Sequence, residues 1–191
     1  HSLDRRQRQM CIRDSCRTDA PTAPQLACHL MCSFAARYRW RLKTFDCKTA
    51  FLTGKAHERD IYVMLPKEGL PGVENGSLIK LIKGAYGLRE APRLWYLKAK
   101  ETIEKAGFEE LRTGRGAFVL RDRSGPEPKL VAILVLHVDD ACHAGHGPVY
   151  EKACQHIFRN LTIGRHGQDD FTLLGRHVVQ LDDCTIMLDQ K

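Results

Sequence analysis

Leu130-Val-Ala-Ile-Leu-Val-Leu-His-Val-Asp-Asp-Ala-Cys-His-Ala144 is the stretch that decides the fold. Seven of the eight residues from Leu130 to His137 are apolar, mostly β-branched or leucine, which predicts a strand covered on both faces or nearly so. Two adjacent carboxylates, Asp139 and Asp140, follow it. Because an ionised carboxylate is costly to bury without a partner, the doublet indicates either a bound cation such as Mg²⁺ or a hairpin turn in which the aspartates cap the loop.

Length, charge and cysteine content narrow the class of protein. The chain has 191 residues, 43% of them hydrophobic, which suits one globular core and a second small lobe. No run approaches the length of a membrane span and no secretory signal is visible, so we expect no membrane partner, a cytoplasmic or nuclear location and mostly reduced cysteines. Residues 1–43 carry nine Lys and Arg against three Asp and Glu, which favours nucleic acid as a partner as much as a solvated basic face.

The N-terminal segment, residues 1–18, shows neither helical nor strand periodicity and has few large apolar side chains. We expect it to be disordered or non-native, and it carries no functional argument. The remainder, residues 19–191, is expected to form the folded domain.

The elements expected in the folded domain alternate between helices and hairpins, which indicates an α+β fold with an antiparallel sheet packed on helices. Helices are expected over 24–38, 92–106 and 148–161, with a helical turn at 47–54. Strands are expected over 40–46, 61–65, 78–82, 108–111, 117–120, 130–137, 141–144, 171–181 and 185–188. Loops are expected at 66–77 and 84–92, and the Asp182-Asp183 doublet is interpreted as turn chemistry.

The first helix, 24–38, raises the question of a zinc site. Its predicted apolar face consists of Leu26, Ala27, Leu30, Met31, Phe34 and Ala35. Cys28, His29 and Cys32 lie on the same helix, but no complementary pair follows at the spacing of a zinc finger or ribbon. Ordinary packing is therefore the better interpretation.

The strand 40–46 also ends on a carboxylate, Asp46. If it lies beside the strand that leads to Asp139 and Asp140, three carboxylates converge on one edge of the sheet. Such a cluster repels itself unless a metal occupies it, and two divalent ions about 3.5–4 Å apart are the known arrangement for in-line phosphoryl displacement.

Three ordered motifs carry a resemblance to a known family. They are Phe45-Asp-Cys-Lys-Thr-Ala-Phe-Leu-Thr-Gly54, Lys83-Gly-Ala-Tyr-Gly-Leu-Arg-Glu-Ala-Pro-Arg-Leu-Trp-Tyr96 and Leu134-Val-Leu-His-Val-Asp-Asp140. In order and spacing they resemble the successive motifs of the reverse transcriptase of Copia-type LTR retrotransposons. The similarity covers nearly all of the chain after about residue 19.

This resemblance implies a polymerase palm with partial fingers. Asp46 matches the first catalytic carboxylate, Asp139 the second and Asp140 the supporting one. Two Mg²⁺ ions, or Mn²⁺, would be held by these three side chains and by the backbone carbonyl of Cys47. The implied partners are a deoxynucleoside triphosphate and an RNA or DNA template with its primer; the oligomeric state is left open.

Four further residues match nucleotide-facing positions of the family. Phe51 falls where an aromatic ring lies beneath the incoming sugar and leaves no room for a 2′-hydroxyl, although a ring buried in the domain is the alternative. Tyr86 and Gly87 match the segment against nucleotide and template, or form a turn. Arg89 is a candidate phosphate contact, as is Arg93, although both could be ordinary surface arginines.

The sequence departs from the family pattern at His137, where tyrosine is usual, and at Glu90, where glutamine is usual. Cys47 replaces a common valine. The basic finger strands would precede residue 19, and no thumb or RNase H region is expected within 19–191. A decayed or domesticated nucleic-acid-binding remnant therefore stands as the alternative to a polymerase, and the 83–96 segment disfavours a third option, a nucleotide cyclase.

Overall fold

A computed structural model describes residues 18–65, 68–69 and 71–189. The elements are α2 (Gln25–Tyr38), β1 (Leu42–Cys47), the 3-10 helix η1 (Ala50–Thr53), β2 (Ala56–Met64), β3 (Leu78–Lys83), α3 (Ala91–Lys105), β4 (Phe108–Leu111), β5 (Gly114–Asp122), β6 (Lys129–His137), β7 (Asp140–Gly145), α4 (Pro148–Asn160), β8 (Ile163–Gln168), β9 (Asp170–Leu173), β10 (Arg176–Gln180) and β11 (Ile186–Asp189). The expected α+β class is confirmed. Residues 1–17 and part of the predicted 66–77 loop lie outside the described residues.

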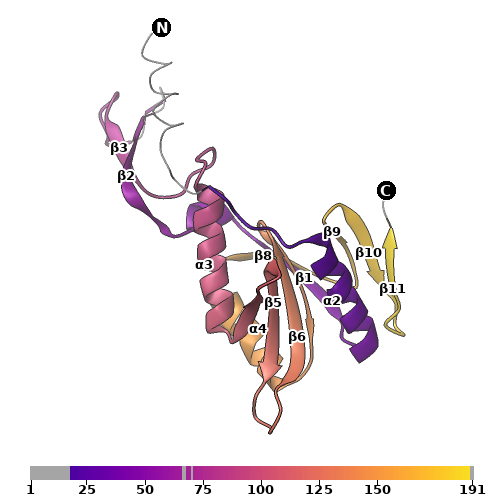
Figure 1. Ribbon diagram of the computed structural model, residues 1–191. Coiled ribbons are helices and arrows are strands. Elements are labelled where there is room, and N and C mark those ends of the chain that lie inside the picture. Colours follow the sequence, from indigo (N-terminus) through magenta and orange to yellow (C-terminus); the bar gives the residue numbers. More distant parts are fainter. Residues whose placement is uncertain (1–17, 66–67, 70, 190–191) are drawn as a thin grey trace.

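The main sheet has six antiparallel strands in the order β4-β5-β6-β7-β1-β8, and the apolar run that decides the fold is its strand β6 (Figure 1). Ala132, Leu134 and Leu136 point into one core cluster, whereas Ile133 and Val135 point into another. Both faces of β6 are therefore covered, which explains an unbroken apolar run in an antiparallel strand.

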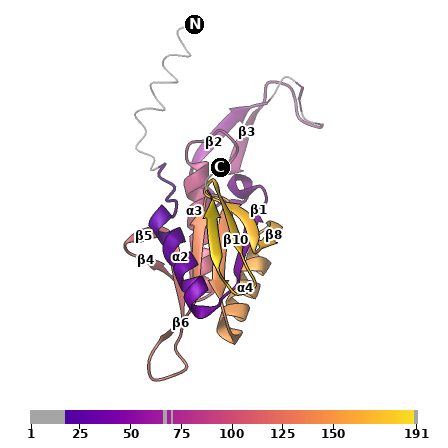
Figure 2. The same ribbon diagram turned by 90° about the vertical axis from the view of Figure 1, so that its right-hand side faces the viewer.

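Helices cover the two faces of this sheet unequally. Helices α3 and α4 share a core with one face, around Trp95, Ile103 and Ile157. Helix α2 and the three-stranded sheet β11-β10-β9 cover the other, around Met31 and Val178 (Figures 1 and 2). The main sheet is thus the middle layer of the domain, and adjacent residues of its strands face different surroundings.

Strands β2 and β3 form a separate two-stranded ribbon that extends away from the main sheet (Figure 1). Its exposed apolar side chains include Tyr62, Met64, Leu78 and Ile82. The observed strand β2 is longer than the strand predicted over 61–65, because it begins at Ala56.

Two sequence predictions are wrong in detail, and one strand is missing from them. The strand expected over 171–181 is two strands, β9 and β10, because Leu174 and Gly175 adopt positive φ angles of 52° and 73° and turn the chain back. Strand β8 was not predicted at all. The buried face of α2 is rotated from the predicted one: Leu26 and Leu30 are exposed, while Cys28 and Cys32 join the core.

The described cysteines are free thiols, as expected: Cys28, Cys32, Cys47, Cys142, Cys154 and Cys184. Burial raises the pKa of Cys28 and of Cys32 to about 11, so both side chains pack as neutral thiols. No helix in the described part of the chain is long and apolar enough to cross a membrane.

Candidate active site

Strand β7 brings the carboxylates of the first and the third sequence motif together. Strand β1 pairs with β7 in antiparallel register, and Asp46 lies directly opposite Asp140. The neighbour of β1 is therefore the return strand β7 and not β6, the strand that the sequence suggested. Directly opposed residues have Cβ atoms about 4.5–5.5 Å apart, so the fold brings the carboxylates of Asp46 and Asp140 to one place.

Asp139 lies in the tight turn between β6 and β7. The turn residue before it, Val138, has a φ of 56°, a left-handed conformation that is unusual for a β-branched residue and costs about 1–2 kcal/mol. The backbone N–H of Cys47 donates to the carbonyl of Asp139 over 2.9 Å. The turn is thus tied to the end of β1, one residue beyond Asp46.

Burial and mutual repulsion both act on the carboxylates of this cluster. Burial, reinforced by the negative charges of Asp139 and Asp46, raises the pKa of the Asp140 carboxyl. Burial and the same three aspartates raise the pKa of the Cys47 thiol to about 12. The region therefore favours positive charge, which is the electrostatic condition for binding a cation.

Asp46 is also contacted by β8. Its carboxylate accepts a hydrogen bond from the backbone N–H of Arg165, and Oδ2 lies 3.8 Å from Nε of that arginine. The neighbouring residue, Gly164, makes this approach possible, because an added Cβ would lie 2.6 Å from Asp46 Oδ1. Since β8 was not predicted, sequence reasoning missed both residues.

The three carboxylates provide the right donor atoms for a hard divalent cation, because Mg²⁺ prefers carboxylate oxygens. Their side chains are not turned onto a common point: across residues 18–65, 68–69 and 71–189, no three or more His, Cys, Asp or Glu side chains are grouped to hold a metal ion. The donor set therefore fits a metal in chemistry and charge, and its side chains would reorient to bind one.

A cleft of about 390 Å³ lies beside the two opposed aspartates. Its lining comes from β1, β7, β8 and β9, namely Thr44, Phe45, Asp46, Asp140, Ala141, Arg165, His166, Gly167, Phe171, Thr172 and Leu173. Two of the three candidate carboxylates thus face open space that a ligand can enter, next to an arginine.

The predicted nucleotide-facing residues lie on η1 and on the connection before α3. Phe51 packs edge-on against Tyr86, with ring centroids 5.9 Å apart. Tyr86 is 66% exposed, and it forms a turn with Gly87, whose φ is 88°. Arg89 is exposed on the same connection. The turn interpretation of Tyr86 and Gly87 is therefore correct for the backbone, and their role toward a nucleotide stays a prediction.

The departures from the family pattern have distinct surroundings. His137 lies opposite Asp140 in the β6–β7 register, and its buried Nδ1 has no hydrogen-bond partner in the described part of the chain. Glu90 is mostly buried, with Oε1 2.6 Å from Nδ1 of His57 and Oε2 3.4 Å from Arg59. The negative charge of Glu90 thus lies beside the imidazole of His57 and the guanidinium of Arg59.

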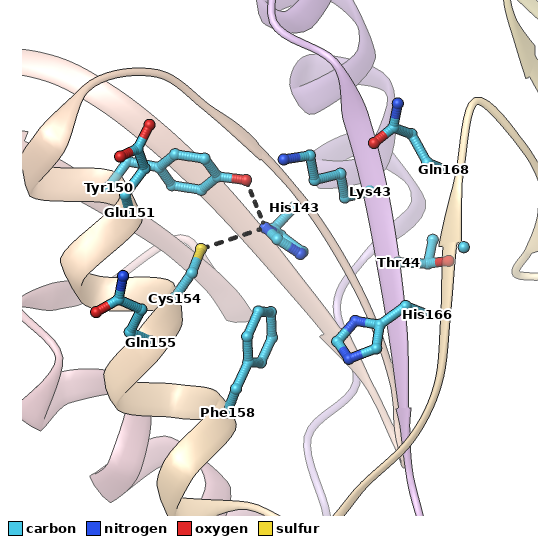
Figure 3. A pocket seen from close by; sticks show the side chains of 11 residues that line it. Lys43, Thr44, His143, Tyr150, Glu151, Cys154, Gln155, Phe158, His166 and Gln168 are labelled. Carbon is cyan, nitrogen blue, oxygen red and sulfur yellow. Dashed lines mark hydrogen bonds between the residues drawn. The ribbon is translucent and has the colours of Figure 1, made fainter.

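A larger pocket of about 650 Å³ lies on the other face of the sheet, under α4 (Figure 3). Tyr150 and Cys154 approach Nδ1 of the buried His143 at 2.8 and 3.8 Å. Burial, with the nearby charges of Lys43 and His166, lowers the pKa of His143 to about 3, so this histidine is neutral. None of the three candidate carboxylates lines this pocket.

The raised pKa of Asp140 gives a testable prediction. Folding favours the protonated carboxyl, so this group's contribution to stability is fully present below its ordinary pKa of 3.8 and is lost as pH rises through the folded-state value. Asp140→Asn removes the charge, and we expect a higher unfolding temperature than the parent at pH 7 and no difference below pH 3.8. Asp182→Asn, in the exposed turn, is the control. Equal unfolding temperatures at pH 7 would contradict the repulsion.

Comparisons with known proteins agree with the motifs. Residues 5–152 match a family model described as "Reverse transcriptase (RNA-dependent DNA polymerase)". The chain is 26% identical over 135 residues to the retrovirus-related Pol polyprotein from transposon RE1 of Arabidopsis thaliana, and 30% identical over 126 residues to that from transposon TNT 1-94 of Nicotiana tabacum. It is also 30% identical over 146 residues to a putative transposon Ty5-1 protein of Saccharomyces cerevisiae.

These matches cover 71%, 66% and 75% of the chain, respectively. They span only 9% of the length of each of the two plant polyproteins and 45% of the yeast protein. The expected resemblance to Copia-type retrotransposon proteins is confirmed for this part of the relatives.

Proposed function

This chain belongs to the reverse transcriptase (RNA-dependent DNA polymerase) family, and from that premise we propose that it forms the palm, with part of the fingers, of an RNA-directed DNA polymerase. The reaction is nucleotidyl transfer from a deoxynucleoside triphosphate to the 3′-hydroxyl of a primer. The observation that carries the proposal is the direct opposition of Asp46 and Asp140 across β1 and β7, with Asp139 in the adjoining turn. Residues 19–191 are the catalytic part, in a cytoplasmic retrotransposon particle or in the nucleus.

The three carboxylates would act as metal ligands. Reverse transcriptases generally use divalent metal ions, and here Asp46, Asp139 and Asp140 would hold two Mg²⁺, or Mn²⁺, with the carbonyl of Cys47. Bound ions would supply charge neutralisation for the triphosphate and a lower pKa for the primer hydroxyl. The carboxylates would fix where the ions sit, so that positive charge is already in place where negative charge develops in the transition state.

Nucleotide selection is assigned to η1 and the connection before α3. The ring of Phe51, held edge-on by Tyr86, would exclude a 2′-hydroxyl by steric contact. Gly87 presents open backbone, because an added Cβ would meet no atom within 4 Å. Arg89 is exposed nearby and suits a phosphate of nucleotide or template.

A second candidate function is a remnant that binds nucleic acid without polymerising. One observation favours it: the Asp46 carboxylate is engaged by the backbone N–H of Arg165 and faces the guanidinium of that residue. A carboxylate held in this way would have to release its partner before binding a metal. Residues 19–43 carry four Lys and Arg against one Asp, and this basic balance would serve such a remnant equally well.

Primer extension separates the two functions. The chain, expressed together with the reading frame that flanks it, is incubated with an RNA template, a DNA primer, deoxynucleotides and Mg²⁺. We expect primer-dependent DNA synthesis, with template binding followed in parallel by fluorescence anisotropy. Template binding without any DNA product would overturn the polymerase proposal in favour of the remnant.

A further inference from the structure

The turn that carries Asp139 has a conformation that needs external support. Val138 is a β-branched residue at a φ of 56°, where its side chain crowds the following carbonyl. Backbone strain of this kind persists only where surrounding contacts over-determine it, and it is found disproportionately at functional sites. The two carboxylates that follow Val138 therefore depend on whatever holds this residue in place.

Two hydrogen bonds hold the turn through consecutive carbonyls. The indole N–H of Trp95 donates to the Val138 carbonyl over 2.8 Å, and the backbone N–H of Cys47 donates to the Asp139 carbonyl over 2.9 Å. Trp95 is 1% exposed. Because its N–H is shielded from water, movement of the turn would leave a buried donor unpaired, which resists the movement.

The same tryptophan belongs to a helix that contacts the segment after Asp46. An added Cβ on Gly54 would lie 2.9 Å from the Trp95 backbone nitrogen, so η1 and α3 are in close contact at this point. The N–H of Lys55 donates to the carbonyl of Leu94 over 3.1 Å. One end of α3 thus touches both chain segments that deliver the carboxylates, β1 through η1 and β7 through the turn.

We infer that Trp95 is a positioning residue for the metal site: its indole N–H fixes the Val138 carbonyl and thereby sets Asp139 and Asp140 relative to Asp46. The inference rests on the proposed function, since it takes these carboxylates as the cation ligands. The indole N–H of Trp95 is a donor only and supplies no ligand atom to an ion. It acts by keeping the strained turn in place, with Asp139 and Asp140 beside Asp46.

The chain offers a matched control, because its other tryptophan, Trp40, is also buried but packs in the core on the opposite face of the sheet. Mn²⁺ affinity of the 191-residue chain is measured by electron paramagnetic resonance for the parent, Trp95→Phe, Trp40→Phe and Asp46→Asn. We expect Trp95→Phe to weaken Mn²⁺ binding about 10-fold, equivalent to about 1.4 kcal/mol. We expect Trp40→Phe to change it less than 2-fold, at a comparable loss of thermal stability.

A second variant keeps the test valid if Trp95→Phe fails to fold. Replacing Trp95 by β-(3-benzothienyl)alanine retains the shape of the ring and removes only the N–H, and the same 10-fold loss is expected. In the parent, the indole ¹H–¹⁵N resonance of Trp95 should shift when Mg²⁺ is added, whereas that of Trp40 should not.

The outcomes separate this inference from the proposed function. If the parent binds Mn²⁺ through Asp46 and both Trp95 variants bind it equally well, the positioning role is overturned and the polymerase proposal stands. If the parent shows no Mn²⁺ binding that depends on Asp46, the proposed metal site fails, and the role of Trp95 fails with it.

Discussion

Asp139→Asn, made in the chain with its flanking reading frame, is expected to reduce RNA-templated DNA synthesis on the order of 10³-fold. Asparagine has nearly the size of aspartate and leaves the hydrogen bond between the Asp139 carbonyl and Cys47 intact, because that bond is made by the backbone. What it removes is one negative oxygen ligand. The measurement is the steady-state rate of primer extension at saturating deoxynucleotide and Mg²⁺.

The Asp182-Asp183 doublet supplies the control for this experiment. It lies in an exposed turn, where Asp183 accepts a hydrogen bond from the backbone N–H of Thr185. Asp182→Asn changes the charge by the same amount as Asp139→Asn and should leave the rate within about 2-fold of the parent. Anisotropy should report the same template affinity for both variants. Equal activity of Asp139→Asn and the parent would refute the catalytic assignment.

Phe51→Ala is expected to relax sugar discrimination by about 10–200-fold, measured as the ratio of kcat/KM for deoxynucleotide over ribonucleotide. The ring is half-buried at the edge of the core and held against Tyr86, so its removal opens space where the 2′-hydroxyl would lie. The physical effect is loss of a steric clash, and incorporation of ribonucleotides should rise more than incorporation of deoxynucleotides falls.

Phe34→Ala is a suitable control for Phe51→Ala. Phe34 is a half-buried phenylalanine of α2, and it packs against the core on the other face of the sheet. Both variants should lose stability, but only Phe51→Ala should change the ratio. If Phe51→Ala lowers kcat/KM for both kinds of nucleotide by the same factor, the ring has a purely structural role.

Much of the fold follows from local signals. The unbroken apolar run of β6 and the 3.6-residue period of helix α4 are local signals, and they were sufficient to predict both elements. Strand β8 has no such signal, since Gly164 and Gly167 interrupt it and contribute no side chain. Its strand state comes from pairing with β1, a long-range contact that no local window contains.

The helix face of α2 shows a related limit. Periodicity identified the helix but not which of two overlapping stripes is buried, because Leu26 and Leu30 are more hydrophobic than Cys28 and Cys32. The observed face places the smaller cysteines against the sheet, where Cys142 of β7 is fully buried. The gap between helix and sheet determines which face of α2 is buried, and that gap is set by tertiary packing, not by the helix sequence alone.

The candidate site likewise has a part that the sequence predicts and a part that depends on tertiary contacts. Asp46, Asp139 and Asp140 stand out in the sequence because carboxylates at strand ends are unusual. Their actual pairing, and the contact of Trp95 with the turn, depend on strand register and on the packing of α3. Register is set jointly by turns and by both core faces, so no single motif encodes it.

Strand β1 places a strict requirement on the spacing of its residues. Asp46 shares one face of β1 with Leu42, whereas Phe45 and Cys47 pack into the core behind the other face. Inserting or deleting a single residue within Leu42–Cys47 would exchange the two faces, which would bury the carboxylate in the core with α3 and α4 and move the phenylalanine out of that core. A change of length here would therefore displace the buried side chains together with Asp46, whereas a substitution at the half-exposed Lys43 would leave them in place. Spacing within these six residues is therefore a stricter requirement of the site than residue identity at the half-buried positions.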